Sequence, residues 1–526
     1  MRLSTLVVMA ALVAAQPPAR APQQPTFRSG TRLVQVSVIV HDGRRQPVEG
    51  LTPEDFRVFE DGREQRVALF EVHTRTGSAN GSAVSSSDAA TPAPGTFTNR
   101  IPSPAASGVV AILFDQLNMG SMAQSRAREQ LLRYLRRLRP TDRVALYALT
   151  PDGVRLLYDY THDANTLVAA LNRVQQGESR ELVAGQDQPS AALTQGLSAF
   201  AMANIQNTAA HFKRLRSETT VEALEQVGSH LAGIPGRKNI VWLSTGFPFR
   251  INVSTPAGAA PSPMSGETGR ATRALNNSDA AVYPIDVRGL LPPSFAKEAS
   301  QLGMLHVPIE GLKAFADWTG GRLFFNTNGL ADAMEQAVQD SRASYTLAYY
   351  STSDVLDGSF RRIKVSVARR DVEVRHRSGY YAVDRVAAPV DRQTALTTAL
   401  NSPLAATGLT LSLRPTRKED GRIELAIDLS PGTPALSRSE EAWTGSVDVL
   451  IAQTTESGER IRDMDATQPV ALTDQGREQI LKKGLRLIRT ITLRPETIDV
   501  RVVVRDATTG TIGSVVIPAA ALRAER

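Results

Sequence analysis

Residues 109–121 read VVAILFDQLNMGS, an apolar run that ends at Asp115 and then turns polar. Six consecutive apolar residues, Val109 to Phe114, are typical of a strand buried on both faces of a parallel sheet. From Gly120 to Arg139, leucine and alanine recur at helical spacing, and Pro140 ends the segment. The stretch therefore predicts a strand, a polar loop and a helix. It leaves three roles open for its aspartate: metal ligand, nucleophile or strand end.

The same alternation of strands and helices continues from residue 108 to residue 342. Such alternation argues for an α/β domain, an open and mostly parallel sheet with helices on both faces. Strands are expected at 109–114, 143–149, 154–158, 239–244, 281–287 and 322–325. Helices are expected at 120–139, 164–174, 189–215, 221–231, 268–277, 309–319 and 330–341.

Strand-like segments flank this α/β region on both sides. Residues 27–75 alternate valine with less apolar residues around Asp-Gly turns, which predicts short antiparallel strands. They are too few for a complete β-sandwich, so we expect residues 343–383 to complete it. Residues 76–107, rich in Ser, Ala, Gly, Pro and Thr, are expected to form a flexible linker. Residues 391–526 are expected to form a second β-sandwich domain.

The N-terminus has the pattern of an export signal. Its first fifteen residues, MRLSTLVVMAALVAA, combine Arg2 with an apolar core and small residues before Gln16. This predicts a signal peptide at 1–15 and a soluble protein that is secreted or periplasmic. No later apolar run reaches the ~20 residues that a spanning helix needs. The 526-residue chain has no cysteine, which excludes disulfides, thiol catalysis and thiolate metal sites.

Polar side chains follow several of the predicted strands. In open α/β sheets, ligands bind outside the carboxyl ends of the strands, where the strand order reverses. Thr219 and Thr220 are expected to open the helix before the strand at 239–244. The resulting rim set is Asp115, Asn118, Thr219, Thr220, Ser244, Thr245 and Asp286. Oxygen donors from several loops suit a hard cation such as Mg²⁺. Alternatively, Asp115 and Thr219 only cap helices, and residues 244–246 only turn the chain.

Residues 30–383 resemble a known family. The ordered motifs FRVFEDG, ILFDQLN, RKNIVWLSTG, VYPIDVRG, TGGRLF and SYTLAYY are similar to those of bacterial secreted "VWFA-related" proteins, abundant in Acidobacteria. Residues 108–342 resemble the von Willebrand factor type A domain itself. The resemblance implies a Rossmann-like sheet and, commonly, a metal-ion-dependent adhesion site for Mg²⁺ or Mn²⁺. That site uses an Asp-x-Ser-x-Ser motif, a later threonine and a further aspartate.

On this chain, the adhesion-site motif keeps its first aspartate and loses both serines. The aspartate is Asp115, whereas the serine positions carry Leu117 and Met119, whose side chains cannot ligate a hard cation. A single carboxylate holds a divalent cation weakly. We therefore expect a degenerate site with no cofactor, or at most weak Mg²⁺ or Mn²⁺ binding. The resemblance gives its ligands as Asp115, Thr219 or Thr220, and Thr245.

The sequence favours binding over catalysis. It has no phosphate-cradling Gly-rich loop, no Gly-x-Ser-x-Gly elbow and no His-Glu-x-x-His helix. The basic run 133–139 is more simply the solvated face of an amphipathic helix, so nucleic acid is not an expected partner. We expect a secreted, non-enzymatic, adhesion-like protein whose rim binds a protein or a cell-envelope component. Two alternatives stay open: a metal-dependent hydrolase or phosphatase using Asp115, and a structural role with an inert rim.

Overall fold

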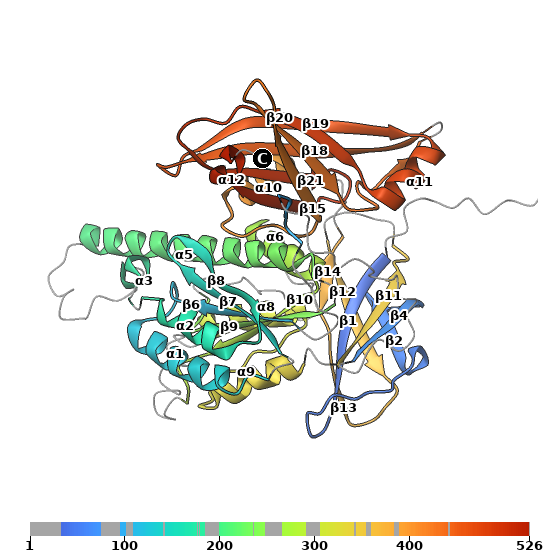
Figure 1. Ribbon diagram of the computed structural model, residues 1–526. Coiled ribbons are helices and arrows are strands. Elements are labelled where there is room, and N and C mark those ends of the chain that lie inside the picture. Colours follow the sequence, from blue (N-terminus) through green and yellow to red (C-terminus); the bar gives the residue numbers. More distant parts are fainter. Residues whose placement is uncertain are drawn as a thin grey trace, which may run out of the picture.

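A computed structural model shows an α/β domain with two β-rich domains beside it (Figure 1). The structure describes residues 33–74, 95–100, 109–139, 142–175, 177, 179–184, 199–234, 236–247, 266–290, 306–340, 343–353, 359–382, 389–439 and 442–524. The predicted signal peptide at 1–15 lies outside these residues, as does most of the predicted linker.

The α/β domain is built on one five-stranded sheet. Its order is β10-β9-β6-β7-β8, and neighbouring strands are parallel except for the hairpin of β7 and β8. The strands are β6 (Val109–Asp115), β7 (Arg143–Thr150), β8 (Gly153–Thr161), β9 (Lys238–Ser244) and β10 (Ala280–Asp286). The chain moves from β6 to β7 on one side and later returns to β9 on the other. The strand order therefore reverses at the carboxyl ends of β6 and β9.

Helices cover both faces of this sheet, which explains the continuous apolar run of β6. Ile112 and Phe114 join the core on one face, and Ala111 and Leu113 join the core on the other. The first core is covered by α1 (Ser121–Leu135), α2 (Ala164–Asn172) and α9 (Leu330–Gln339). The second is covered by α5 (Ala199–Leu231), α6 (Gly266–Asn277) and α8 (His306–Thr319). This mixed, doubly covered sheet fits the expected α/β class.

One prediction about the helices is wrong. The two helices expected at 189–215 and 221–231 are a single helix, α5, over the part that the structure describes. Thr219 and Thr220 therefore lie inside a helix and do not open one. The Thr220 hydroxyl donates to the carbonyl oxygen of Arg216 (2.7 Å), so it is satisfied without ending the helix.

The strand expected at 322–325 is reduced to a single bridge between Phe324 and Ile285. Phe324 N donates to Pro284 O (2.9 Å), and Asp286 N donates to Phe324 O (2.8 Å). At Asn326 the backbone takes a left-handed φ of 51°, which turns the chain away from the sheet. The segment therefore contacts β10 without extending the sheet by a full strand.

The N-terminal β-rich domain combines two segments that are far apart in the sequence. Its two sheets, β13-β1-β11-β4 and β14-β12-β2-β3, enclose one apolar core. In the first sheet Val34 of β1 lies opposite Tyr349 of β11. The α/β domain lies between these segments in the chain. The elements are β1 (Leu33–Asp42), η1 (Pro53–Asp55), β2 (Phe56–Glu60), β3 (Arg63–Gln65), β4 (Val67–Thr74), β11 (Ala343–Tyr350), β12 (Phe360–Val367), β13 (Val372–Arg375) and β14 (Gly379–Tyr381).

The C-terminal β-rich domain also has two sheets around one core. Their orders are β20-β16-β15-β5 and β17-β18-β21-β22, with β19 paired to β18. Its strands are β15 (Leu411–Arg417), β16 (Ile423–Leu429), β17 (Ser437–Arg438), β18 (Trp443–Thr455), β19 (Arg460–Leu472), β20 (Arg486–Ile491), β21 (Thr497–Asp506) and β22 (Ile512–Pro518). Its helices are α10 (Pro389–Asn401), α11 (Asp474–Lys483) and α12 (Ala519–Arg523).

Part of the predicted flexible linker belongs to this C-terminal domain. Phe97 and Thr98 form strand β5, which pairs with β15. The Asn99 amide donates to the carbonyl oxygens of Ala406 and Leu409, both at 2.7 Å. The linker prediction is therefore wrong for these residues. A two-residue strand whose partners lie more than 300 positions away leaves no local pattern in the sequence.

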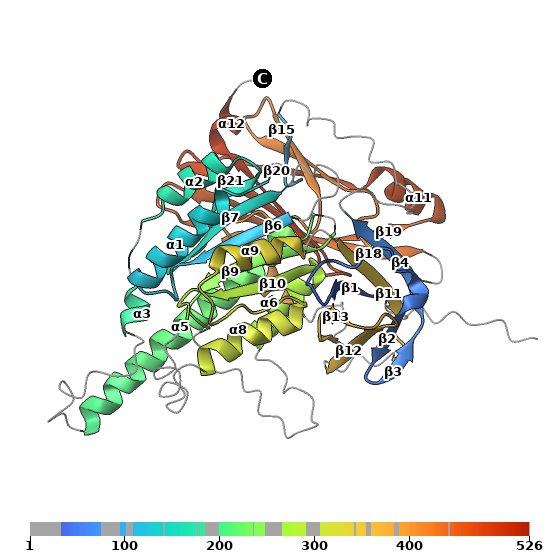
Figure 2. The same ribbon diagram turned by 90° about the horizontal axis from the view of Figure 1, so that it is seen from below.

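The end of helix α5 docks on the C-terminal domain, which lies above it in Figure 1. Thr407 Oγ1 donates to His230 O (2.6 Å), and Gly233 N donates to Thr407 Oγ1 (2.8 Å). Leu404 belongs to the same apolar core as α5 and α6. The opposite half of α5 extends beyond the sheet in Figures 1 and 2. The small helix α3 (Arg180–Ala184) packs against α5.

Candidate functional site

Asp115 ends β6 at the switch point of the sheet and is completely buried. Its carboxylate accepts hydrogen bonds from Asn118 N (2.9 Å), Asn118 Nδ2 (3.0 Å), Trp242 Nε1 (3.0 Å) and Ser244 Oγ (2.7 Å). Burial raises the pKa of Asp115 above its ordinary value, while the donors from Ser244, Asn118 and Trp242 act in the opposite direction. We call these four residues the Asp115 network.

Asn118 connects the Asp115 network to helix α5 and to the loop after β9. Its Nδ2 donates to Thr220 Oγ1 (2.9 Å), and Thr245 Oγ1 donates to its carbonyl oxygen (2.6 Å). Arg216 Nη1 donates to Asn118 Oδ1 at 3.4 Å. Burial lowers the pKa of Arg216, and the negative charges of Asp115 and Glu181 oppose this shift. The buried Asp115 carboxylate therefore interacts with the positive charge of Arg216.

The two residues at the lost serine positions point away from the network. Leu117 belongs to the core on the α5 face of the sheet, and Met119 belongs to the core on the α1 face. Gln124 holds the loop between them in place, because its Nε2 donates to Met119 O (2.8 Å) and to Gly177 O (2.8 Å). The loop after β6 is thus anchored by packing on both faces and by hydrogen bonds.

The structure brings together only part of the predicted rim set. Five of its residues meet in or against the network: Asp115, Asn118, Thr220, Ser244 and Thr245. Asp286 instead pairs with Arg288, whose Nε lies 2.9 Å from its carboxylate. Thr219 lies half-buried on α5 beside this group.

Sequence reasoning missed two members of this site, Trp242 and Arg216. A signal for Trp242 existed, since a buried indole N–H needs an acceptor and Trp242 precedes Ser244 by two residues on the same face of β9. Arg216 lies one helical turn before Thr220. Placing a helix boundary between them hid that relation.

These residues do not fit a divalent cation. Both carboxylate oxygens of Asp115 already accept hydrogen bonds, and the two positions that would supply hydroxyl ligands are apolar and buried. The guanidinium of Arg216 adds a repelling positive charge. Among the described residues, no group of three or more His, Cys, Asp or Glu side chains is arranged to hold a metal ion.

Exposed apolar side chains lie at the same end of the sheet as the buried Asp115 network. Large apolar residues are exposed at four points on this end of the sheet: Met122 (87%), Val183 (52%), Leu290 (56%) and Phe325 (55%). We call them the apolar rim. Met122 lies in the first turn of α1, Val183 in α3, Leu290 in the loop after β10, and Phe325 beside the residue that bridges to β10.

Hydrogen bonds tie the loops of the apolar rim to one another. Arg126 Nη2 and the backbone N of Leu290 both donate to Asn328 Oδ1, at 2.5 and 3.1 Å. A Cβ at Gly289 would lie 2.2 Å from the Arg126 guanidinium, and the φ of Gly289 is +81°. Glycine is therefore required for Arg126 to cross this loop. On the other side of the loop after β6, Ser179 Oγ donates to Leu117 O (3.1 Å) and positions α3.

Comparisons with known proteins give low similarities. No family model matches the chain, and no curated protein matches its sequence. Among solved structures it is similar to a von Willebrand factor type A protein from Catenulispora acidiphila, with 11% identity, a TM-score of 0.26, and 93% of this chain and 74% of that chain covered. It is also similar to the pilus adhesin SpaC from Lactobacillus rhamnosus GG, with 10% identity, a TM-score of 0.26, and 81% of this chain and 56% of that chain covered.

A third similar structure is the SpRpn10 VWA domain, with 12% identity, a TM-score of 0.21, and 44% of this chain and 94% of that chain covered. Structural neighbours of this chain thus include type A domains and a pilus adhesin. Separately, none of the helices in the described ranges is both long and apolar enough to cross a membrane.

Metal titration gives a direct check of the Asp115 network. Millimolar Mg²⁺ or Mn²⁺, and EDTA, are expected to change the melting temperature by no more than ~1 °C, whereas a ligand at a hundredfold excess over its Kd adds about 2.7 kcal/mol of stability. The measurement is a thermal melt of the wild type and of Asp115→Ala. If Mg²⁺ or Mn²⁺ raises the melting temperature of the wild type but not that of Asp115→Ala, the conclusion that these residues do not fit a cation is wrong.

Proposed function

We propose that this protein is a secreted, non-enzymatic, adhesion-like protein that binds a protein or cell-envelope component through its apolar rim. We also propose that its α/β domain is a von Willebrand factor type A domain with a degenerate metal site. The observation that carries the proposal is that four exposed apolar side chains lie at the end of the sheet where the polar Asp115 network is buried. The apolar residues offer contact area, and the polar centre offers rigidity.

Exposed apolar residues that cluster at one end of a fold support an interaction surface. Single exposed apolar residues are common, but several gathered on connected loops favour a protein partner. Methionine and phenylalanine are enriched at such interfaces. Met122 fits this role because it lies in the first turn of α1 and is the most exposed residue of the four. The hydrogen bonds through Asn328 hold two sides of the surface in a fixed relation, which reduces the entropy lost on binding.

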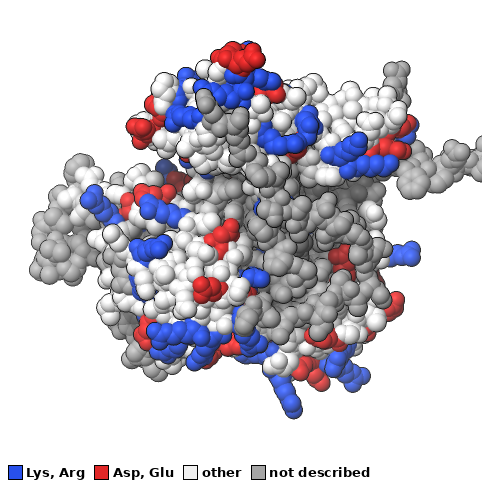
Figure 3. All heavy atoms as spheres, viewed as in Figure 1, with Lys and Arg blue, Asp and Glu red and all other residues white. Residues whose placement is uncertain are grey.

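The charge distribution supports a partner other than nucleic acid. On the face drawn in Figure 3, the described Lys and Arg side chains lie among Asp and Glu side chains and form no broad basic surface. Nucleic-acid binding depends on clustered positive charge. The formal net charge of +7 is therefore better explained by a soluble surface with charges of both signs.

The alternative of a hydrolase or phosphatase using Asp115 has less support. A nucleophile or general base must reach its substrate, or reach it through one water. Asp115 has no exposed surface, and four donors already occupy its carboxylate. An assay with p-nitrophenyl phosphate bears on this alternative. Turnover by the wild type that Asp115→Asn abolishes would favour it over the binding proposal.

The binding proposal predicts a loss of adhesion when the apolar rim is changed. In the double variant Met122→Asp/Phe325→Ser, retention on immobilised envelope extract is expected to fall at least ~10-fold, because central interface residues contribute the equivalent of a tenfold or larger change in affinity. Aspartate in the first turn of α1 also favours the helix, so the fold should be preserved. The measurement is the bound fraction against extract concentration.

The control is Ile488→Thr, which removes from β20 in the C-terminal domain an apolar residue about as exposed as Phe325. This variant is expected to bind as the wild type does. If both variants bind equally well, the contact surface lies elsewhere and the proposal fails.

A further inference from the structure

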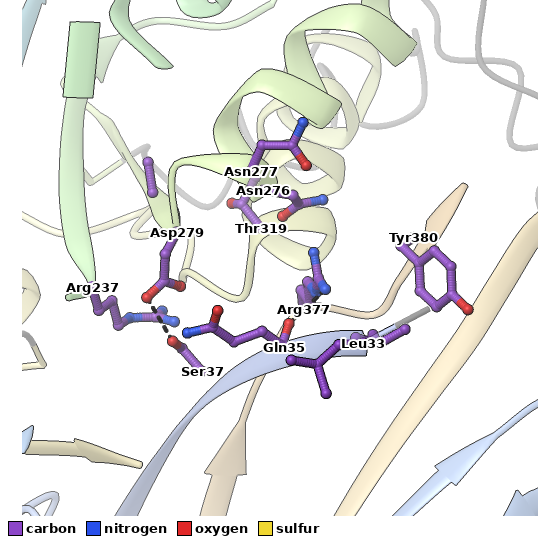
Figure 4. Close-up of a pocket in the computed structure, with 12 residues that line it drawn as sticks. Leu33, Gln35, Ser37, Arg237, Asn276, Asn277, Asp279, Thr319, Arg377 and Tyr380 are labelled. Atoms are coloured by element: carbon purple, nitrogen blue, oxygen red, sulfur yellow. Dashed lines mark hydrogen bonds between the residues drawn. The ribbon is translucent and has the colours of Figure 1, made fainter. Parts of the chain in front are cut away.

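A cavity lies between the N-terminal β-rich domain and the α/β sheet, at the opposite end of that sheet from the apolar rim (Figure 4). Its volume is about 260 Å³. One wall is the first half of β1, and the other consists of residues just before β9 and β10, among them Arg237 and Asp279. In Figure 4 the side chains of Gln35, Arg237 and Arg377 surround the same space.

One wall of this cavity is an open strand edge. Residues Leu33–Val38 pair with β11 on one side, whereas β13 covers only Ile39–Asp42 on the other side, so within the described chain no strand lies beside the first half of β1 there. Arg377 Nη2 donates to the carbonyl oxygen of Gln35 (2.6 Å), which places the Gln35 backbone on that uncovered side. Because backbone direction alternates along a strand, Leu33 and Ser37 present their backbone groups to the same side.

The charge of the cavity favours one negative group. Arg237 and Arg377 line it, and the acidic residue among its described lining is Asp279. The Asp279 carboxylate already accepts a hydrogen bond from Ser37 Oγ (2.7 Å). The described lining of the cavity therefore carries two guanidinium groups and one carboxylate.

Arg237 is prepared for such a ligand. Its side chain is almost fully buried, and its Nη2 donates to Gly320 O (2.6 Å) and weakly to Tyr283 Oη (3.4 Å). Its Nε is buried and has no hydrogen-bond partner in the described structure. Arg237 also lines the cavity, and a guanidinium that the fold holds in place is well suited to a carboxylate that meets its accessible nitrogens.

From these observations we infer that the cavity binds the C-terminal end of an extended peptide. The peptide backbone lies along the open edge of β1, and its terminal carboxylate faces Arg237 and Arg377. Strand addition supplies backbone hydrogen bonds, and the guanidinium groups select a free carboxylate. The cavity is smaller than the ~300–1,000 Å³ of drug-sized pockets, so it holds only the last few residues. This site is separate from the apolar rim and does not depend on the proposed function.

The test uses matched probes on the full chain. Isothermal titration compares acetyl-trialanine with a free carboxylate, the same peptide as a C-terminal amide, and acetate. We expect the free acid to bind at least ~10-fold more tightly than the amide, because one charged hydrogen-bonded pair is lost. We expect acetate to bind more weakly than the tripeptide acid, since it has no backbone to pair with β1. Equal affinity of acid and amide would overturn the inference, as would binding of acetate as tight as that of the tripeptide.

Two variants locate the site without disturbing the fold. Gln35→Glu adds a negative charge to an exposed position at the cavity. It is expected to weaken binding of the free-acid peptide at least ~10-fold. The control is Gln468→Glu on β19, which makes the same change in another domain and keeps the acceptor for Arg489 Nη2. An unchanged affinity in Gln35→Glu, or an equal loss in both variants, would overturn the placement.

Discussion

Replacing Asp115 with alanine is expected to lower the free energy of unfolding of the α/β domain by about 3–4 kcal/mol. The change removes the acceptor shared by four donors and leaves the buried N–H groups of the Asn118 backbone and the Trp242 indole without that partner. Asn118 Nδ2 and Ser244 Oγ keep only their second acceptors, Thr220 Oγ1 and Gly246 O. It also removes one of the two negative charges, Asp115 and Glu181, that favour the charged form of the buried Arg216 guanidinium. Urea unfolding followed by tryptophan fluorescence measures the effect, since the Trp242 indole donates directly to this carboxylate.

The matched control is Asp286→Ala, at the end of the neighbouring strand β10. Asp286 pairs with Arg288, whose side chain is partly exposed and can turn to solvent once the carboxylate is gone. The expected loss is about 1–2 kcal/mol. If Asp115→Ala is no more destabilising than Asp286→Ala, the Asp115 network does not hold the loop after β6 together.

Local patterns predicted the α/β domain well because each element there carries its own signal. The apolar run of β6 requires a strand covered on both faces, and the helical spacing of leucine and alanine predicts α1. The helix ends at Leu135, before the expected end at residue 139. From these elements, and from the rule that ligand sites form where the strand order reverses, the sequence predicted that Asp115 and Ser244 lie close together. Arg216 could not be predicted in the same way, because its contact with Asn118 joins helix α5 to the loop after β6 and depends on how the whole domain packs.

Long-range pairing sets the limit of prediction for the rest of the fold. Strand β5 is two residues long, and its place in the C-terminal domain is fixed by pairing with β15 and by the Asn99 side chain. Neither leaves a periodic pattern around residue 97. The same holds for contacts between domains, whose residues are separated by hundreds of positions. Such contacts include a buried ionic group between the N-terminal β-rich domain and the α/β domain.

That group consists of His41 on β1, Asp340 after α9 and Arg375 on β13. Arg375 Nη1 lies 2.6 Å from Asp340 Oδ2, and His41 Nε2 lies 3.1 Å from Asp340 Oδ1. Arg375 Nη2 contacts His41 Nδ1 at 2.8 Å. Because arginine can only donate, Nδ1 accepts, and Nε2 carries the proton toward Asp340. All three side chains are buried or nearly so, and every polar contact in the group crosses between distant segments of the chain.

Arg375→Met is expected to lower the free energy of unfolding by about 3–5 kcal/mol at neutral pH, because it leaves the Asp340 carboxylate buried without its cation. Calorimetry of the full chain measures the loss. Arg414→Met is the control, since it breaks a partly exposed ion pair with Asp428, which keeps Arg486 as a partner, and such a pair is worth about 1 kcal/mol or less. Equal losses in the two variants would contradict a special role for the interdomain group.

The pH dependence of the wild type gives an independent check of the same group. Although burial raises the pKa of Asp340, the hydrogen bond from His41 and the charge and hydrogen bond of Arg375 outweigh it and hold the pKa below its ordinary value of 3.8. A carboxylate with a lowered folded pKa adds stability above its unfolded pKa and loses it as pH falls through the folded pKa. The loss in free energy of unfolding that Asp340→Asn causes, relative to the wild type, is therefore expected to be largest at neutral pH and to shrink below pH 3.8. A deficit that stays constant down to pH ~2 would mean that the ionised carboxylate does not join the two domains.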